Sequence, residues 1–180
     1  RYADLVRGHC EKFMDREDFV RIAARGFNAV RLPVPWYVFG EEGPDCGPYV
    51  GCIEHVDRAL DWAEEIGLNV VFALAINPGA PHEGDVMCRD LANDVVYRLS
   101  KRYASRVGFF GIEIADDVVV QHRRGLTLTD GVPQHQLRNY YREAYELVRS
   151  AAGDDPVVIM PDGGFPAGFV NFMAQRHYRN

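Results

Sequence analysis

Four short apolar runs alternate with amphipathic segments along the chain, and this alternation limits the folds that the chain can adopt. The runs are largely apolar throughout, rather than alternating between apolar and polar residues, which is typical of parallel strands buried on both faces. Their starts recur about every 40 residues, the spacing of successive strand–helix units. The sequence therefore predicts an α/β protein with a parallel sheet. The predicted strands are Asn28–Val34, Leu68–Ala75, Val107–Ile114 and Pro156–Met160.

Helices are expected around these strands, because apolar residues recur there at intervals of three and four. Asp15 and Asp18 form a capping-box-like pair at the start of the first predicted helix. Gly67 follows the second predicted helix as a C-terminal glycine. Pro33 and Pro35 lack a backbone N–H and are expected to end the pairing of the first strand. The predicted helices are Arg16–Arg25, Ile53–Ile66, Val86–Tyr103, Gln136–Ala151 and Phe169–His177.

Two architectures fit this order of elements, a (β/α)8 TIM barrel and a doubly wound open sheet. No G-x-G-x-x-G turn follows any predicted strand, so the dinucleotide-binding version of the open sheet lacks its best sequence support. A complete barrel needs about 250 residues, whereas this chain has 180. We therefore predict one domain over residues 1–180, an incomplete barrel of about four βα units whose remaining strands lie outside this chain.

Charge and composition exclude several classes of function. The formal net charge of −6 argues against a nucleic-acid-binding surface and against an anionic membrane as a partner. No apolar run approaches the roughly 20 residues that span a bilayer. No signal-peptide pattern opens the chain, but a signal can be removed, so the compartment stays open between cytoplasm and secretion.

The cysteines form no C-x-x-C pair, which argues against a zinc ribbon or a thioredoxin-like motif. A chain of this size can bury a real core without a disulfide scaffold, so the cysteines are predicted to be reduced. His82 and Glu83 lie close together in sequence, but no tight His/Cys pair accompanies them. Neither a metal nor a cofactor is therefore expected. The cysteines are Cys10, Cys46, Cys52 and Cys88.

Functional groups in barrels gather where strands end and helices have yet to begin. Asp116 and Asp117 follow the third predicted strand, and paired carboxylates there can provide acid–base catalysis. The alternative is a pair of solvated aspartates that opens a loop. Glu113 lies within the same apolar strand and is expected to pair with Arg31, because a buried charge needs a partner. That ion pair is either part of a site or purely structural.

Aromatic residues offer a second group of candidates. Trp36 and Tyr37 follow the first strand, where exposed rings can stack on the apolar faces of sugars. Packing at the top of the barrel is an equally good explanation of this pair. Tyr140, Tyr141 and Tyr145 occur at helical spacing and are predicted to be core and surface residues rather than part of a site.

The run Gly26–Trp36 and the strand segment Gly111–Glu113 belong to a series of motifs that covers nearly the whole chain. Their order resembles that of glycoside hydrolase family 5, in particular its exo-β-glucanase-like members. Gly26–Trp36 is similar to the second βα unit of these enzymes, and Gly111–Glu113 to the strand that leads to their catalytic acid. Further similar segments are Asp18-Phe19, Pro48–Glu54, Leu60–Ala63, Pro78-Gly79 and Pro156–Gly163.

The resemblance implies a retaining hydrolase of O-glycosidic bonds in β-glucan-type carbohydrate, which works with two carboxylates and no cofactor. In the family, Asn-Glu-Pro follows the fourth strand, and its glutamate is the acid/base. Asp117 occupies that place here, and Asp116 replaces the asparagine. Asp116, Arg31 and Trp36 would bind the sugar. A histidine that commonly ends the third strand is replaced by Ala75.

These departures leave three hypotheses open. The first is a hydrolase whose activity is impaired, because Asp117 is shorter than glutamate by one methylene. The second is a catalytically degenerate barrel that binds carbohydrate or a protein partner without cleavage. The third is a half-barrel that folds only with the missing barrel portion as its partner. The resemblance places the nucleophilic glutamate on the seventh strand, beyond Asn180.

Overall fold

The structure is a computed structural model that describes residues 2–40, 50–75, 89–116, 118–121, 123–124, 126–128, 131–164, 169 and 172. None of the described helices is long and apolar enough to cross a membrane. In chain order, the elements are α1 Tyr2–Phe13, α2 Arg16–Ala24, β1 Ala29–Pro35, α3 Ile53–Ile66, β2 Asn69–Ala75, α4 Arg89–Tyr103, β3 Phe109–Glu113, β4 Arg123–Arg124, β5 Thr127–Leu128, α5 Gln134–Ala152 and β6 Val157–Ile159.

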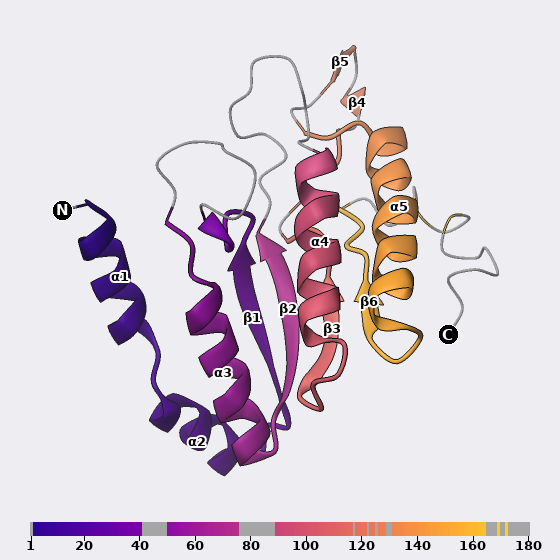
Figure 1. Cartoon of the computed structure of the whole chain (residues 1–180). Helices are drawn as coiled ribbons and strands as arrows, with labels where there is room; N and C mark the ends of the chain where they lie inside the picture. Colours follow the sequence, from indigo (N-terminus) through magenta and orange to yellow (C-terminus); the bar gives the residue numbers. More distant parts are fainter. Residues whose placement is uncertain are drawn as a thin grey trace.

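A parallel sheet forms the centre of the molecule, with the strand order β1-β2-β3-β6. The helices α3, α4 and α5 all lie on one face of this sheet (Figure 1). A doubly wound sheet carries helices on both faces, whereas a barrel carries them on the outside only. The one-sided cover therefore favours the barrel. All four predicted strands are confirmed.

Local sequence explains the helices next to β1 and β2. Asp15 caps α2 through a complete capping box, in which each of Asp15 and Asp18 accepts a hydrogen bond from the other's backbone N–H. The helix α3 ends at Gly67, whose φ of 86° is a conformation that glycine adopts without strain. The N–H of Gly67 donates to the carbonyls of Ala63 and Glu64. These features were all visible as short sequence patterns.

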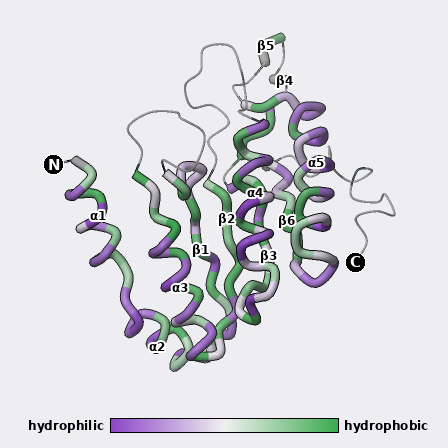
Figure 2. Tube along the Cα trace, in the orientation of Figure 1, coloured by the Kyte–Doolittle hydropathy of each residue, from purple (hydrophilic) through white to green (hydrophobic). Residues whose placement is uncertain are grey.

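The core lies between the sheet and the helix layer. Phe72, Tyr103 and Phe109 form an aromatic cluster there, with ring centroids 4.9 to 6.2 Å apart. Figure 2 shows hydrophobic residues along the strands, and alternation of hydrophilic and hydrophobic residues along α3, α4 and α5. The residues of α5 that are buried in this core are Leu137, Tyr140, Tyr141, Ala144 and Val148.

The prediction that prolines end the pairing of β1 was wrong, because β1 pairs with β2 as far as Pro35. At one end of the strand, the carbonyl of Asn28 accepts a hydrogen bond from the N–H of Asn69. At the other end, the N–H of Trp36 donates to the carbonyl of Ala75. In a parallel ladder, only alternate residues of a strand bond to a given neighbour. Pro33 and Pro35 therefore turn their nitrogens away from β2, where their missing N–H breaks no bond.

Two elements were not predicted, α1 and the hairpin of β4 and β5. No described side chain of α1 is fully buried, although its apolar period is comparable to that of α2. The predicted start of α4 at Val86 lies outside the described residues. Most of the predicted helix Phe169–His177 does too, although Phe172 is helical.

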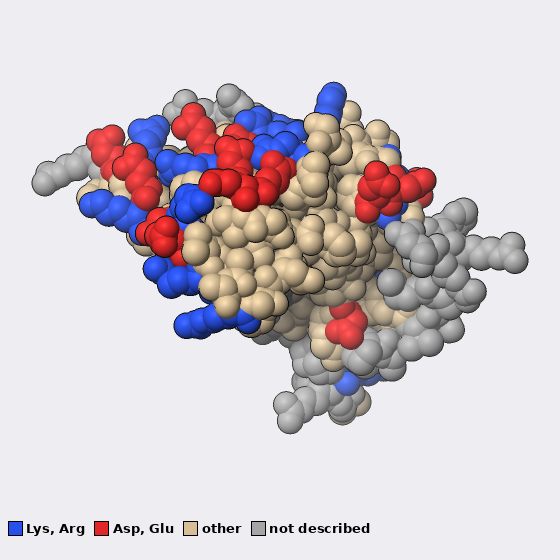
Figure 3. All heavy atoms as spheres, turned by 90° about the horizontal axis from the view of Figure 1, so that it is seen from below, with Lys and Arg blue, Asp and Glu red and all other residues tan. Residues whose placement is uncertain are grey.

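Seen from below, acidic and basic side chains intermingle along one side of the molecule (Figure 3). Arg106 holds α3 to the start of β3 on this lower side. Its guanidinium donates to Glu64 at 2.8 to 3.1 Å and to Asp61 at 2.6 Å. Glu64 also accepts from the N–H of Gly108 at 2.9 Å. These contacts lie at the N-terminal end of the strands, the stability face of a barrel.

Candidate functional site

Arg31 lies between two carboxylates on the face of the sheet opposite the helices. Its Nε donates to Oε2 of Glu113 at 2.6 Å, and its Nη2 donates to Oδ1 of Asp116. The arginine side chain is 47% exposed, whereas those of Glu113 and Asp116 are only 12% and 21% exposed. The hydrogen bond that Arg31 donates to Glu113, followed by the one it donates to Asp116, raises the pKa of Arg31 above its ordinary value. The predicted pairing of Arg31 with Glu113 is confirmed.

A β-bulge in β3 turns Glu113 toward Arg31. Val70 pairs with Phe109 and Val71 pairs with Gly111, so Phe110 is the extra residue. Past the bulge, Gly111 and Arg31 pair with the same residue of β2, Val71, from opposite sides. Glu113 lies two residues after Gly111, so its side chain is on the same face of the sheet as that of Arg31. Without the extra residue, alternation would direct Glu113 into the helix-covered core.

Asp116 is positioned by the neighbouring strand. Its backbone N–H donates to the carbonyl of Leu74 at 2.8 Å, so the chain continues beside β2 past the end of β3. Asp116 therefore lies at the carboxyl end of the sheet, where barrel enzymes carry their functional groups. Its carboxylate accepts a charge-assisted hydrogen bond from the Arg31 guanidinium.

Two buried tyrosines fix the strand ends that surround this carboxylate pair. The hydroxyl of Tyr140 donates to the carbonyl of Ile114, two residues before Asp116. The hydroxyl of Tyr141 donates to the carbonyl of Pro161 at 2.5 Å, just after β6. Burial raises the pKa of both tyrosines, so both stay protonated donors. Sequence reasoning placed them correctly in the core but missed this role.

Asp162 is a further acidic residue at the same edge, which sequence reasoning did not select. Its Oδ1 accepts from the N–H of Gly164 at 2.8 Å. After burial, the charges of Asp162 and Glu113 are the next causes that raise the pKa of Tyr141. Both carboxylates are therefore within electrostatic range of one hydroxyl. The available sequence signal for Asp162 was its position two residues after the predicted strand Pro156–Met160.

The other predicted site residues have different outcomes. Trp36 is half-buried against the core at the end of β1 and makes an edge-to-face contact with Tyr37, with centroids 5.3 Å apart. It shares the carboxyl edge of the sheet with Asp116. Asp117, like His82 and Glu83, lies outside the described residues. In the described part of the chain, no group of three or more His, Cys, Asp or Glu side chains is placed to bind a metal ion.

The arrangement can hold a polar ligand by hydrogen bonds at the edge of the sheet. Arg31 is half exposed and fixed in direction by two acceptors, so its remaining N–H groups point in defined directions. Asp116 can accept from a hydroxyl but cannot donate while ionised. Acid–base catalysis also needs a side chain near the ligand that can give or take a proton. The carboxyl group of Asp117 is the candidate, because Asp117 follows Asp116 directly in the sequence.

Curated proteins similar to this chain are fungal glucosidases. A protein named "probable glucan 1,3-beta-glucosidase A", from Aspergillus terreus, is 29% identical over 181 residues, covering 91% of this chain and 39% of the relative. The glucan 1,3-beta-glucosidase of Lachancea kluyveri is 28% identical over 171 residues, covering 87% of this chain and 37% of the relative. The chain thus spans about two fifths of the length of these relatives. No family model matches the chain.

Solved structures similar to the fold include bacterial endoglucanases. An endoglucanase from Pseudomonas stutzeri in complex with cellobiose matches with a TM-score of 0.60 and 16% identity, covering 80% of this chain and 40% of its own. An endo-beta-1,4-glucanase from Xanthomonas axonopodis pv. citri matches with a TM-score of 0.61 and 15% identity, covering 82% and 43%. The fold is therefore that of an incomplete (β/α) barrel. The chain is thus similar to glucan glucosidases in sequence and to endoglucanases in fold, over the central part of a barrel.

Proposed function

We propose that the chain is part of a barrel that hydrolyses O-glycosidic bonds of β-glucan-type carbohydrate by a retaining, two-carboxylate mechanism. In this proposal, Asp117 is the acid/base, and Arg31, Asp116 and Trp36 bind the sugar. The observation that carries it is the placement of Arg31 between Glu113 and Asp116 at the carboxyl edge of a barrel-type sheet. The names of the relatives, glucan 1,3-beta-glucosidases, support the class of substrate.

Each proposed role follows from the chemistry of the side chain. Arg31 would donate to a sugar hydroxyl with the N–H groups that its two acceptors leave available. Trp36 would offer an apolar ring face to the sugar. Asp117 would protonate the departing glycosidic oxygen and later activate water, while a second carboxylate roughly 5 Å away attacks the sugar.

The same proposal requires further strands to complete the barrel. The uncovered face of the sheet carries exposed apolar side chains, with Phe110 49% and Ile159 37% exposed. In a closed barrel, such inward side chains pack in layers with those of the opposite strands. We therefore place the nucleophilic carboxylate on a strand that is not part of this chain.

A second candidate function is carbohydrate binding without cleavage. The ion pair of Asp116 with Arg31 favours it, because an ionised carboxylate at this place cannot donate to the sugar as an asparagine would. A degenerate barrel of this kind would keep the sugar-binding edge and lose the acid. A protein partner in place of a glycan is the remaining version of this candidate.

Hydrolysis of a nitrophenyl β-glucoside by the full-length protein tests the proposal. We expect measurable turnover, and we expect the Asp117→Glu variant to turn over about a hundredfold faster, because a carboxyl group misplaced by about 1 Å costs about that factor. An Asp116→Asn variant is compared with it, because it changes the neighbouring sugar-binding side chain and leaves the proposed acid in place.

Binding is measured in parallel by calorimetry with a β-glucan oligosaccharide. Binding without turnover in the parent protein and in both variants would contradict the hydrolase and support the second candidate. If neither turnover nor binding is found, both carbohydrate functions are wrong. Equal rates for the parent and for Asp117→Glu would contradict the role given to Asp117.

A further inference from the structure

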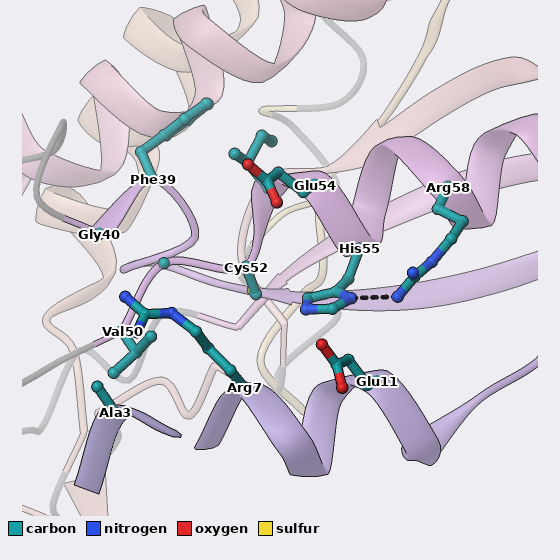
Figure 4. A pocket seen from close by; sticks show the side chains of 12 residues that line it. Ala3, Arg7, Glu11, Phe39, Gly40, Val50, Cys52, Glu54, His55 and Arg58 are labelled. Carbon is teal, nitrogen blue, oxygen red and sulfur yellow. Dashed lines mark hydrogen bonds between the residues drawn. The ribbon is translucent and has the colours of Figure 1, made fainter. Parts of the chain in front are cut away.

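Two adjoining cavities lie between α1 and the first turn of α3, away from the carboxyl-edge site. One measures about 420 Å³ (Figure 4) and the other about 390 Å³. Cys52 lines both, and Cys10 lines the second. Neither Arg31, Glu113 nor Asp116 lines either cavity. The two thiols therefore belong to a region that the proposed function does not use.

The two cysteines face a shared space from different elements. Cys10 lies on α1, and Cys52 is the N-cap residue of α3. Figure 4 shows Cys52 on one side of the first cavity, with Arg7 and Glu11 of α1 on the other side. Cys10 lies between these two residues in sequence. Both thiols are unpaired and half-buried, so both can be reached by a small reagent.

Electrostatics support the closeness of the two sulfur atoms. Burial raises the pKa of Cys52 to about 11, and the second cause is the charge that a thiolate at Cys10 would carry. A Coulombic effect between side chains falls with distance, so it indicates that the two groups are near one another. Cys52 is also held in place, because its N–H donates to the carbonyl of Val38 at 2.7 Å.

The helix α1 contributes no fully buried side chain to the core among the residues that the structure describes. Only Met14 and Asp15 separate α1 from α2. A disulfide needs Cα atoms within about 7 Å of each other. Cys10 and Cys52 line one cavity between the helices, so the two thiols face the same open space.

We propose that Cys10 and Cys52 are a redox-modification site, at which a disulfide links α1 to the first turn of α3. The oxidant is a low-molecular-weight disulfide such as oxidised glutathione. The Cys10 thiolate attacks one of its sulfurs, forms a mixed disulfide and releases one glutathione thiolate. The deprotonated Cys52 then attacks the Cys10 sulfur and releases the second glutathione thiolate. Two protein thiols are oxidised and one glutathione disulfide is reduced.

The link would restrain the chain that follows β1. Cys52 is hydrogen-bonded to Val38, and Tyr37 lines the same cavity as the two thiols. Tyr37 in turn contacts Trp36 at the carboxyl edge of the sheet. The disulfide would therefore restrain Tyr37 and Val38, which follow β1, and close a loop between residues 10 and 52.

Peptide mapping after equilibration of the purified full-length protein with reduced and oxidised glutathione tests the proposal. Free thiols are alkylated and the protein is digested with trypsin. Cys10 falls in the peptide Gly8–Lys12, and Cys88 in the peptide Ala59–Arg89. Cys52 shares a peptide with Cys46, so a Cys46→Ser variant makes the assignment unambiguous.

We expect Gly8–Lys12 to be joined to the Cys52 peptide, with a mass two hydrogen atoms below the sum of the two peptides. The joined species should persist in Cys46→Ser and disappear in Cys10→Ser and in Cys52→Ser, each checked for native circular dichroism. It should also form at a more reducing glutathione ratio in buffer than in urea.

Three results would overturn the proposal. The first is a Cys10 that stays alkylated, or glutathionylated, at every glutathione ratio. The second is a link from Cys10 to Cys46 or Cys88 in place of Cys52. The third is a Cys10–Cys52 link that forms no more readily in buffer than in urea, since the folded arrangement would then contribute nothing. None of these results depends on whether the protein hydrolyses glycans.

Discussion

The strands β3 and β6 lie close together at Gly111, and replacing this residue by alanine is the sharpest test of the fold. A Cβ atom added to Gly111 would lie 2.3 Å from the carbonyl oxygen of Val157 and 3.0 Å from its carbonyl carbon. Both atoms belong to the backbone of β6, which cannot rotate away as a side chain can. The strands β3 and β6 would have to separate, just where Gly111 pairs with Val157.

The magnitude follows from two opposing effects. Overpacking of this kind costs about 1–3 kcal/mol, and we take about 3 kcal/mol because the obstacle is backbone. Alanine in place of glycine recovers about 0.4–1 kcal/mol by restricting the unfolded chain. We therefore expect Gly111→Ala to lower the free energy of unfolding by about 2 kcal/mol. In a chain of this size, such a loss lowers the melting temperature by about 4–8 °C.

Gly8 supplies the matched control. It lies within α1, and an added Cβ would meet no atom within 4 Å. Gly8→Ala should therefore stabilise the protein by about 0.5–1 kcal/mol, the ordinary gain for alanine over glycine in a helix. The same chemical change is thus expected to have opposite signs at the two positions.

Urea denaturation followed by circular dichroism and by tryptophan fluorescence measures both variants. The m-value should stay constant, since the surface exposed on unfolding does not change. If the two variants differ in stability by less than about 0.5 kcal/mol, the close approach of β3 and β6 at Gly111 is refuted.

Two further predictions concern side-chain contacts. Tyr140→Phe removes the hydroxyl that donates to the buried end of β3 at Ile114, and we expect a loss of about 1–3 kcal/mol in thermal or urea unfolding; an unchanged midpoint would contradict this contact. The Arg106 guanidinium beside Glu64 holds the pKa of that carboxyl below its ordinary value of 4.5. The ionised Glu64 therefore stabilises the folded state above about pH 4.5, and this stabilisation is lost as the pH falls through the lower pKa of the folded state. Glu64→Gln should therefore be less stable than the parent near neutral pH, and equally stable in strong acid; a stability difference that persists in acid would show that the charge is not its cause.

The secondary structure near β1 and β2 was predictable because its causes are local. The capping box of Asp15 and Asp18 and the glycine cap at Gly67 involve residues a few positions apart. The helix α1 was missed, although its apolar period is comparable to that of α2 and was therefore open to the same reasoning. The prediction that the prolines end the pairing of β1 failed because its cause is not local. Whether Pro35 breaks a ladder depends on which neighbouring strand its nitrogen faces.

The candidate site was predictable in part. An isolated arginine and an isolated glutamate in apolar strands each demanded a partner, so the pairing of Arg31 with Glu113 followed from the cost of burying a charge. The addition of Asp116 to this pair depended on the chain continuing beside β2 after β3 ends. The tyrosine hydroxyls that hold the strand ends gave no signal, because helical spacing describes a buried ring and not the atom that its hydroxyl meets.

By itself, the sequence determined the parallel strands, the helices between them and the edge of the sheet at which polar residues gather. These features follow from hydrophobic period, caps and chain order, all of which act over short stretches of chain. Only the tertiary structure decided how Glu113 comes to face Arg31, which is through the bulge at Phe110. A bulge is set by how β3 pairs with β2 and packs on the helices, and both contacts join residues that are far apart in the sequence.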